Sequence, residues 1–532
     1  MMEVNVGLVL FLLSILGYLY HLLTRNNDYF HEKPIPSMAV KPIFGSTGSL
    51  ILKRCTWPDF VVEIYNKYAN TKVFGMFDSV TPIFVVQDPE LIKKITIKDF
   101  DHFVDHRPMF GDSRNDSPYT LFGKSLFAMN GSKWRSTRAT LSPAFTGSKM
   151  RQMFELMIDC CESATKYLEG QVQSAKDMNM SDLASRLGTD MIASCAFGIQ
   201  IDSLRNPENE FYSRGKEMIN FERISVVFKM FGFKLCPKLM GRLGIDLIDR
   251  KPGQYFSALI RQAINDRLSK GVIRYDMIHL LLQAKQGVLR HQQESEQYEG
   301  FAVVQESHVG KQQATEGLTE NEMIAQTFVF FLAGFETVAT SLSFVVHDLV
   351  VHEDIQQKLY EEIVATHEAL AGKKLNYDTL QRMEYMDMVI SESMRMRPAA
   401  ILLDRCCTHD YQVDDGEGLR FTIDKGTVVW IPTQGIHMDP KYYPNPYHFD
   451  PERFSAENRH NIDPLTYLPF GIGPRNCIGS RFALMEIKVV LYYLLLSYKF
   501  QRSERTEIPL KMRKGQTILA VESPLIVKFA KR

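Results

Sequence analysis

Cysteine is scarce in this chain and is never spaced as a cysteine-rich metal site requires. Eight cysteines occur among 532 residues, and no two of them form a C-x-x-C pair. Zinc ribbons and cysteine-bound iron–sulfur clusters therefore have no support in the sequence. The cysteines, which include two adjacent doublets, are Cys55, Cys160, Cys161, Cys195, Cys236, Cys406, Cys407 and Cys477.

An excess of charge of one sign is also missing. The 62 lysines and arginines equal the 62 aspartates and glutamates in number, so the formal net charge is zero and no single-signed field favours nucleic acid. No repeat of fixed period is present, which excludes solenoids and propellers. A composition of 45% apolar and 23% charged residues is that of an ordinary folded protein with a large core.

A long uncharged apolar run stands at the N-terminus. Residues 4–23 carry no formal charge over 20 residues, and at about 1.5 Å per residue such a helix spans the ~30 Å hydrocarbon core of a bilayer. The competing interpretation is a cleaved signal peptide, whose apolar region is usually about 7–15 residues long and follows a basic flank. The flank here is "MMEV", so we expect a retained single-pass anchor.

The residues after this run indicate the orientation and the order of domains. Arg25 and Lys33 follow the run, which places the body on the cytosolic side of the membrane. Three prolines between residues 34 and 42 hold the next segment extended and free of helix. The sequence therefore predicts a membrane anchor at 1–24, a stiff proline-rich spacer at 25–48 and one folded domain at 49–532.

The stretch "FGIGPRNCIG", residues 470–479, sets one cysteine among glycines immediately before an apolar helical run. Glycines allow a tight backbone path and the close approach of a flat ligand. The helix that begins after Cys477 points amide N–H groups and its positive dipole end toward the sulfur, which stabilises a thiolate. A helix-capping loop with an incidental cysteine is the alternative, and this stretch alone does not separate the two.

The same stretch matches F-x-x-G-x-R-x-C-x-G and resembles the haem-thiolate loop of the cytochrome P450 superfamily. Four further stretches match motifs of that family in the family's order: "WRSTR", "AGFET", "ESMR" and "PERF". The matching residues are Trp134, Arg138, Ala333, Gly334, Glu336, Thr337, Glu392, Arg395, Arg453, Phe470, Gly473, Arg475, Cys477 and Gly479.

The resemblance implies a fold, a cofactor and a set of site residues. It implies a mainly α-helical protein with small β-sheets, of class α+β, in the cytochrome P450 fold, with haem b bound through the thiolate of Cys477. Glu336 and Thr337 would be the catalytic pair that delivers protons to dioxygen. The cofactor-binding residues would be Trp134, Arg138, Arg405, Arg475, Phe470, Gly473, Gly479, Ala333 and Gly334. His106 stands near the position of another basic residue in many relatives.

The stretch around "AGFET" has the composition of a buried helix. Thr319 and Glu322 form a T-x-x-E capping box at its start, and residues 323–335 are uncharged for 13 residues, too few to cross a membrane and apolar on every side. Glu336 in such a place needs a partner or a function, and a structural ion pair is the alternative. Thr337 can bond to a carbonyl one turn earlier, which would let the helix open and admit water.

Glu392 and Arg395 stand three residues apart in a helical stretch at about 385–396. Both side chains therefore leave the same face of the helix. With Arg453 they would form a buried clamp that holds the cysteine loop. The alternative is a solvated surface pair that contributes at most about 1 kcal/mol.

Hydrophobic periodicity and turn residues predict the remaining elements. They are a hairpin of strands at 73–77 and 82–87, a helix that starts at Asp88 and Pro89, helices at 149–167, 181–197, 254–267 and 352–370, a loop at 285–318, and short strands after residue 499.

The resemblance also implies an activity: a monooxygenase that inserts one oxygen atom of O2 into a lipophilic small molecule. No G-x-G-x-x-G fingerprint is present in the chain, so electrons would come from NADPH through NADPH–cytochrome P450 reductase, with cytochrome b5 as a second candidate partner. The stretch "WRSTRATLSPAFTGSKMRQMFELM" is similar to the insect microsomal family 9, whose members often oxidise plant toxins and insecticides. This similarity implies xenobiotic detoxification at the endoplasmic reticulum membrane.

Substrate selection would use apolar surface above the haem. By resemblance it involves residues 107–122, 211–247 and 399–403, and the central helix near Phe331 and Phe335. The Phe- and Met-rich part of 211–247 suits a substrate wall or a membrane contact, and plain core packing is its alternative. Other functions considered are oxidation of an endogenous lipid or hormone, haem-thiolate isomerisation or dehydration, and non-catalytic lipophile binding. The full set of motifs argues against the last two.

Overall fold

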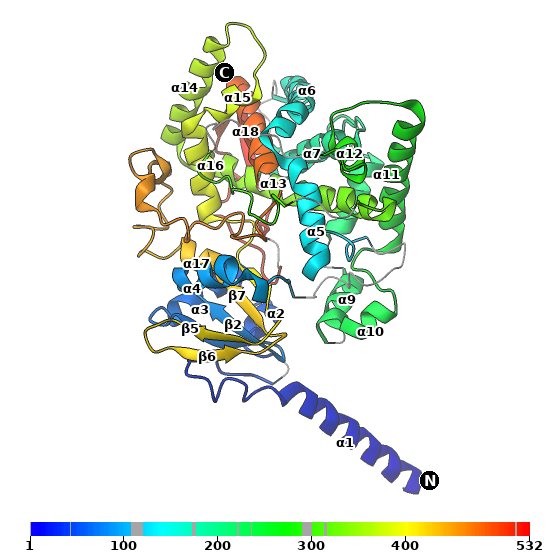
Figure 1. Ribbon diagram of the computed structural model, residues 1–532. Helices are drawn as coiled ribbons and strands as arrows, with labels where there is room; N and C mark the ends of the chain where they lie inside the picture. Colours follow the sequence, from blue (N-terminus) through cyan, green and yellow to red (C-terminus); the bar gives the residue numbers. More distant parts are fainter. Residues whose placement is uncertain are drawn as a thin grey trace.

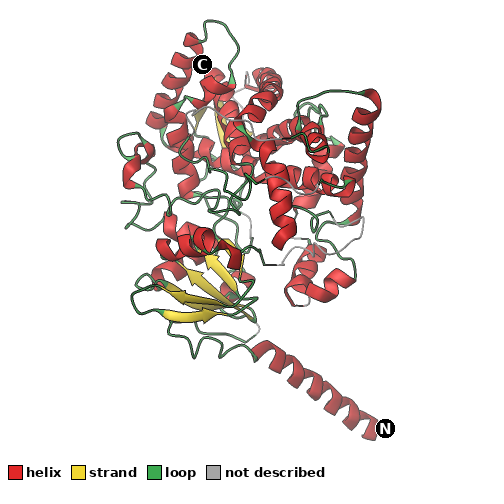
Figure 2. Ribbon diagram, viewed as in Figure 1, coloured by secondary structure: helices red, strands yellow, loops and turns green. Residues whose placement is uncertain are grey.

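Helices form most of the protein, and its largest sheet lies at one end (Figures 1 and 2). The predicted class, mainly helical with small sheets, is therefore confirmed. A computed structural model describes residues 2–42, 44–107, 121–172, 177–220, 223–235, 237–289, 300–312, 317–516 and 519–532.

The helices occupy the following ranges. They are α1 (Met2–Thr24), α2 (Gly48–Ile51), α3 (Trp57–Lys67), α4 (Pro89–Lys93), α5 (Gly131–Leu141), α6 (Gly147–Val172), α7 (Met180–Ile192), α8 (Glu210–Ile219), α9 (Ile224–Leu235), α10 (Pro237–Arg242), α11 (Arg250–Lys270), α12 (Met277–Lys285), α13 (Glu320–Val351), α14 (Glu353–Ala369), α15 (Tyr377–Gln381), α16 (Glu384–Met396), α17 (Thr433–His437) and α18 (Ser480–Ser497). Short 3-10 or π turns include η1 (Lys94–Lys98), η4 (Ala193–Phe197) and η5 (Pro451–Phe454).

Strands far apart in the sequence form the largest sheet, whose order is β1-β2-β7-β4. Strand β2 pairs with β7 in parallel, which sets Ile83 beside Val428, and the other two pairings are antiparallel. Two smaller sheets have the orders β3-β9-β8 and β5-β6. The strands are β1 (Val73–Asp78), β2 (Thr81–Val86), β3 (Asp177–Asn179), β4 (Leu403–Cys406), β5 (Tyr411–Asp414), β6 (Arg420–Ile423), β7 (Val428–Ile431), β8 (Tyr498–Gln501) and β9 (Ile526–Lys531).

The locally encoded predictions are confirmed. Strands β1 and β2 form the predicted hairpin, and Asp88 caps α4 by accepting the Leu91 N–H at 2.9 Å. Both bonds of the capping box between Thr319 and Glu322 are present at the start of α13. The predicted helices correspond to α6, α7 with η4, α11, α14 and α16.

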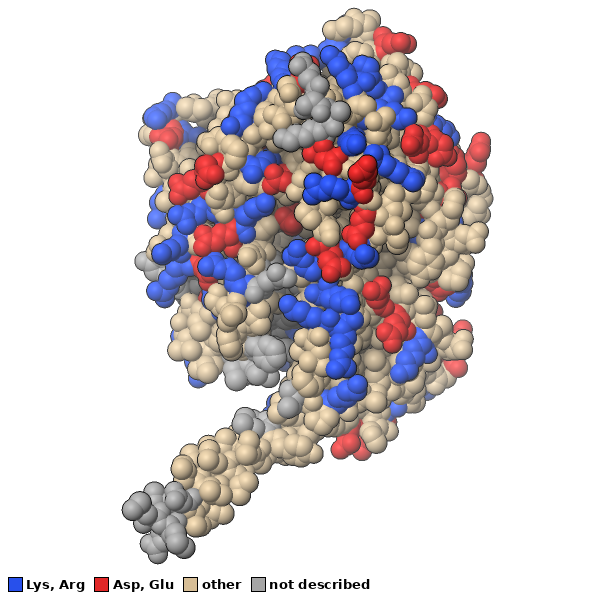
Figure 3. Space-filling view, turned by 180° about the vertical axis from the view of Figure 1, so that it is seen from behind, with Lys and Arg blue, Asp and Glu red and all other residues tan. Residues whose placement is uncertain are grey.

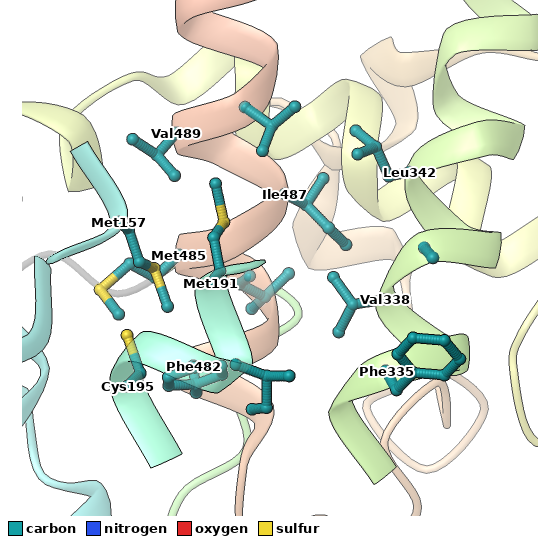
Figure 4. Close-up of a cluster of buried hydrophobic side chains, with 14 of the residues drawn as sticks. Met157, Met191, Cys195, Phe335, Val338, Leu342, Phe482, Met485, Ile487 and Val489 are labelled. Carbon is teal, nitrogen blue, oxygen red and sulfur yellow. The ribbon is translucent and has the colours of Figure 1, made fainter. Parts of the chain in front are cut away.

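Four helical elements, α6, α7, α13 and α18, pack around the largest core (Figure 4). Ile487 of α18 points toward Val338 of α13, whereas Met485 of α18 lies near Met157 of α6 and Cys195 of η4. Helix α18, which follows the cysteine loop, is therefore fixed between α13 and the α6–α7 layer.

One carboxyl group is buried within this core. Glu486 of α18 is 2% exposed, lies against Gly188 of α7, and its Oε2 has no hydrogen-bond partner in the part of the chain that the structure describes. Burial raises the pKa of Glu486 well above its usual range. Burial therefore favours the protonated, uncharged form of this carboxyl group in the folded protein.

Replacing Glu486 with glutamine is expected to stabilise the protein increasingly as the pH rises. An unfolded glutamate ionises at about pH 4.3, whereas burial makes folded Glu486 hold its proton to a higher pH. Above that pH the unfolded state binds fewer protons, so this group lowers the free energy of unfolding by up to about 1.4 kcal/mol per pH unit. Urea unfolding of the parent and of Glu486→Gln between pH 5 and pH 8 should show a difference that grows with pH.

The exposed Glu457 provides the control for this measurement. Glu457→Gln should differ from the parent by the same small amount at every pH, because this exposed side chain contacts water in the folded and in the unfolded chain. A pH-independent difference for Glu486→Gln would show that Glu486 ionises normally in the fold.

Helix α1 projects away from the body (Figure 1). Its described part from Val6 to Tyr18 is apolar and mostly exposed. Figure 3 shows no Lys, Arg, Asp or Glu along this part of the helix. Positive and negative side chains are mixed over the visible face of the body. By length and apolarity α13 is the one described helix that could span a membrane, but 56% of its apolar window is buried in the body. The anchor at 1–24 stays a prediction.

The proline-rich segment lies on the sheet over part of its length. Phe30 is buried, with its ring centroid 5.2 Å from that of Phe77. The Pro36 carbonyl accepts the Gly75 N–H at 2.8 Å, and the Met38 N–H donates to the Gly75 carbonyl at 2.8 Å. From Phe30 onward this segment therefore packs as part of the body.

Residues between α12 and α13 include the predicted loop at 285–318. Its described part at 300–312 contains no helix or strand, as expected. The stretches 290–299 and 313–316 lie outside the described residues.

Candidate active site

The loop that carries Cys477 follows a tight path that depends on glycine. Gly473 has a φ of +72°, and a Cβ there would lie 2.0 Å from the carbonyl oxygen of Thr96 in η1, so a larger residue does not fit. The Cys477 N–H donates to the Phe470 carbonyl at 2.8 Å. Gly479 is the N-cap of α18, which places Cys477 at the positive end of that helix.

The side chain of Cys477 is exposed although it lies deep within the body. Burial raises the pKa of its thiol, whereas a hydrogen bond from the Gly479 N–H and the positive charge of Arg138 lower that pKa. The sulfur therefore faces internal space and not bulk water. It lines a cavity of about 410 Å³ together with Arg138 and Phe145.

One face of α13 is open although the helix is otherwise mostly buried. Ala333 and Thr337 are exposed, one turn apart, between the buried Phe331, Phe335 and Val338. The Thr337 hydroxyl donates to the carbonyl of Ala333, and the helix is continuous through this point. These two small side chains leave a surface that a flat ligand could cover.

Gly334 and Glu336 lie on other faces of the same helix. A Cβ at Gly334 would come 3.1 Å from Ile192 of α7, so the glycine permits the close approach of α7 to α13. Glu336 is half-buried, and burial raises its pKa, while Lys216 of α8 acts in the opposite direction. The structure therefore directs Glu336 toward α8 and Thr337 toward the open face.

Arg475 joins the cysteine loop to the segment before α5. Its three nitrogens donate to the carbonyls of Val104 (2.7 Å), Leu126 (3.4 Å) and Met129 (2.6 Å). Its guanidinium stacks 4.1 Å from the ring centroid of Trp134, which is buried in α5. Arg475 thus brings positive charge to the site, but its hydrogen bonds hold the backbone.

Arg138 and Arg405 are buried guanidinium groups with a free donor. Arg138 Nη1 donates to the Asn476 carbonyl at 2.8 Å, and Arg405 Nη2 donates to the Ile472 carbonyl at 3.0 Å. The Nε of each arginine lacks a hydrogen-bond partner among the residues that the structure covers. Unpaired buried donors fit an anionic group, and the two propionates of haem b are such groups.

His106 lies beside this cationic cluster. Its Nδ1 is 2.9 Å from Asp404 Oδ1. Burial lowers the pKa of His106, and the nearby Arg475 and Arg405 lower it further, against the opposing effect of Asp404. Burial also lowers the pKa of Arg405 to about 10. Asp404 pairs with His106, so the free Nε donors of Arg138 and Arg405 are what this cluster offers to an anion.

The structure brings Glu392, Arg395 and Arg453 together. Arg395 donates to Glu392 through Nε (2.7 Å) and Nη2 (2.8 Å), and Arg453 Nε donates to Glu392 Oε1 at 3.4 Å. Glu392 and Arg395 are fully buried. Arg395 also donates to the carbonyls of His437 and Pro446 at 2.7 Å each. This arrangement is a buried network and differs from the solvated surface pair.

Sequence reasoning missed the residue that links this network to the cysteine loop. His437 is fully buried, its Nδ1 lies 3.0 Å from the Arg395 carbonyl, and its Nε2 accepts the Leu468 N–H at 2.8 Å. Burial lowers the pKa of His437 to about 3, so the ring is neutral and can accept that bond. A lone histidine in a short helix carries no signal for this role.

The two phenylalanines that mark the predicted substrate-contacting part of α13 do not face its open side. Phe331 and Phe335 are fully buried, and the ring of Phe331 packs 4.9 Å from Phe256, 5.2 Å from Phe211 and 5.7 Å from Phe197. Each phenylalanine stands two positions from Ala333 or Thr337, which at 3.6 residues per turn places it on nearly the opposite face of the helix.

The other predicted substrate segments are described in part. Residues 108–120, 221–222 and 236 lie outside the described residues. In 211–247, apolar side chains of α9, α10 and the turn after α10 are strongly exposed: Ile224 (74%), Phe228 (71%), Leu239 (54%) and Leu243 (62%). Plain core packing therefore does not describe these four side chains.

Comparison with known proteins identifies the family. The sequence model of the family Cytochrome P450 matches residues 36–529, so the chain belongs to the cytochrome P450 family. Over 506 residues it is 41% identical to cytochrome P450 9e2 of Blattella germanica, covering 92% of this chain and 91% of that protein. Over 503 residues it is 38% identical to cytochrome P450 9b2 of Drosophila melanogaster, covering 93% of each.

A mammalian relative is also similar: cytochrome P450 3A2 of Rattus norvegicus is 35% identical over 522 residues, covering 97% of this chain and 95% of that protein. The predicted membership of the superfamily and the similarity to insect family 9 are confirmed. The chain is accordingly an oxidoreductase of the cytochrome P450 monooxygenase family, which implies haem with cysteine thiolate ligation.

Proposed function

We propose that this protein inserts one oxygen atom of O2 into lipophilic small molecules, with two electrons that NADPH supplies through a separate reductase. The observation that carries the proposal is the exposed Cys477 sulfur at the positive end of α18, inside the body and beside buried arginines. Haem, when bound, supplies the activation of dioxygen. The protein supplies the ligand, the anion-binding groups and control of water.

Individual residues have distinct roles in this proposal. Cys477 provides the thiolate ligand, and the free Nε donors of Arg138 and Arg405 bind the propionates. Trp134 and Arg475 shape and charge the same wall. Ala333 leaves room for a flat group, and Gly334 lets α7 approach α13 closely behind it. Phe470, Gly473 and Gly479 hold the path of the loop.

Thr337 and Glu336 handle protons and water. The Thr337 hydroxyl stands on the open face of α13 with its own proton bonded to Ala333, so its lone pairs can hold a water molecule there. Glu336, whose pKa burial raises, can exchange a proton between this helix and the region of Lys216 and α8. Together they would move protons from the surface to the open face.

Replacing Thr337 with alanine is expected to uncouple NADPH consumption from product formation. Loss of the hydroxyl removes an acceptor for the water that delivers protons, so product per NADPH should fall about tenfold while hydrogen peroxide rises. NADPH, peroxide and product are measured together with the reductase present. Ser341→Ala is the matched control, because Ser341 stands one turn further on and bonds to the Thr337 carbonyl at 2.9 Å. Unchanged coupling in Thr337→Ala would remove Thr337 from proton delivery.

The substrate class follows from the surroundings and from the relatives. The insect relatives, the apolar α9–α10 surface and the apolar helix α1 support lipophilic substrates taken from a membrane. Figure 1 places α9 and α10 on the side of the body from which α1 projects. We therefore assign detoxification of lipophilic xenobiotics at the endoplasmic reticulum membrane, with a single-pass anchor at 1–24 and the body in the cytosol.

Turnover tests the function directly. In membranes that contain NADPH–cytochrome P450 reductase, with or without cytochrome b5, lipophilic compounds should increase NADPH consumption and appear as products with one added oxygen. Compounds that shift the haem absorption band identify ligands of the site beforehand. Rearrangement of peroxides without NADPH would instead identify an isomerase.

A further inference from the structure

A segment of the loop between α12 and α13 packs over the cysteine loop. We call residues 300–312 the strap. The ring of Phe301 lies 5.1 Å from Phe454 and 5.2 Å from Tyr467, and Ala302 and Val309 are buried. Strap residues and residues of the cysteine loop line two cavities, of about 410 Å³ and 490 Å³. The strap is thus a packed outer layer of the site.

The polar contacts of the strap converge on the peptide that precedes Cys477. Both carboxylate oxygens of Glu306 accept from Arg138 Nη2, at 3.0 Å and 2.8 Å. Arg138 in turn donates to the carbonyl and to the side-chain oxygen of Asn476, each at 2.8 Å, and Asn476 Nδ2 donates to the Gln305 carbonyl at 3.2 Å. The contacts form a closed ring between the strap, α5 and the loop.

The Glu306–Arg138 pair is too buried to be an ordinary surface pair. The side chains are 15% and 3% exposed, respectively. Removing one partner from a buried pair leaves the other charge uncompensated, whereas an exposed pair contributes little. The positive charge of Arg138 acts on the Cys477 sulfur, so the charge of Glu306 determines how much of that field remains.

We propose that Glu306 is a positioning residue that holds Arg138 against the cysteine loop and balances its charge beside the sulfur ligand. The proposal rests on the proposed haem-thiolate function. Without the Glu306 carboxylate, the positive charge of Arg138 beside the sulfur ligand is no longer balanced. An unbalanced positive charge stabilises the reduced haem, which carries one more electron, relative to the oxidised haem. Through Glu306, the strap therefore influences the reduction potential of the haem.

The test is a spectroelectrochemical titration of the full-length haem protein and its variants. In Glu306→Gln the ratio of reduced to oxidised haem at a fixed solution potential should rise about tenfold, a shift of about 59 mV for a one-electron couple. Glu320→Gln is the matched control, because Glu320 forms an exposed pair with Arg261, and its ratio should equal that of the parent. A parent-like ratio in Glu306→Gln overturns the proposal.

Two further variants separate charge from general damage. Glu306→Asp keeps the negative charge, so its ratio of reduced to oxidised haem should equal that of the parent. If Glu306→Gln fails to retain haem, Glu306→Asp is the variant that tests the proposal. A tenfold shift of the ratio in Glu306→Asp overturns the proposal. In an Arg138→Gln background, Glu306→Gln should shift the ratio by clearly less than in the parent, because only the direct field of Glu306 is then lost. An undiminished shift there would mean that Glu306 does not act through Arg138, and it also overturns the proposal. Failure of the proposed function differs from these outcomes, because the parent itself would then lack thiolate-bound haem.

Discussion

Replacing Cys477 with serine is expected to abolish the carbon-monoxide difference spectrum that thiolate-bound haem gives in the reduced protein, together with all monooxygenase activity. A serine hydroxyl does not supply the sulfur anion that donates electron density to the iron. The backbone contacts of the loop use the Cys477 N–H and the Phe470 carbonyl, which the substitution retains. The variant should therefore fold and lose the ligand.

The control for this prediction is another cysteine. Cys55 is a free, partly exposed cysteine of the segment between α2 and α3, so Cys55→Ser should keep the full spectrum. A thiolate spectrum in Cys477→Ser would mean that a different cysteine binds the iron. A spectrum typical of a neutral or histidine ligand in the well-folded parent would contradict the mechanism itself.

The second large effect is expected for Arg395→Ala. The substitution leaves Glu392 fully buried, with Arg453 Nε as its remaining cation at 3.4 Å, and removes the donors to the His437 and Pro446 carbonyls. Breaking a buried pair in this way costs about 3–5 kcal/mol. The free energy of unfolding in urea should fall by that amount, and bound haem should be lost as the loop loosens.

Arg151→Ala is a matched control for the clamp. Arg151 pairs with Asp378 at 2.8 Å, but these side chains are 33% and 47% exposed, so its loss should cost at most about 1 kcal/mol. Equal losses of stability in the two variants would show that the clamp contributes no more than a surface pair. The loss of unfolding free energy in Arg395→Lys should lie between those of the two variants, because lysine keeps the positive charge but cannot make the bidentate contact with Glu392.

Features encoded over a few residues could be predicted from the sequence. The hairpin, the Asp88 cap, the Thr319 capping box and the Glu392–Arg395 pair each depend on spacing within one element, and the structure contains all of them. The family could also be predicted, because each of its motifs is a short local pattern and the motifs occur in the family's order. Local chemistry was sufficient for these predictions.

Contacts between distant segments could not be predicted. Glu306 meets Arg138 and Asn476 only in the folded chain, and the strap has no periodicity that would indicate its place. The sequence predicts that the central helix near Phe331 meets the substrate, but which side chains face it depends on how α8 and α11 pack against α13. Tertiary packing determines which distant residues meet and which face of a helix is open.

The parallel pairing of β2 with β7 has a consequence for biosynthesis. Ile83 cannot meet Val428 until the ribosome has made the intervening chain, which at about 5–20 residues per second takes tens of seconds. During that interval the apolar strand β2 lacks its partner on that edge, and the cysteine loop does not yet exist. Haem capture is therefore a late event, and this edge of β2 stays open to aggregation while the rest of the chain is made.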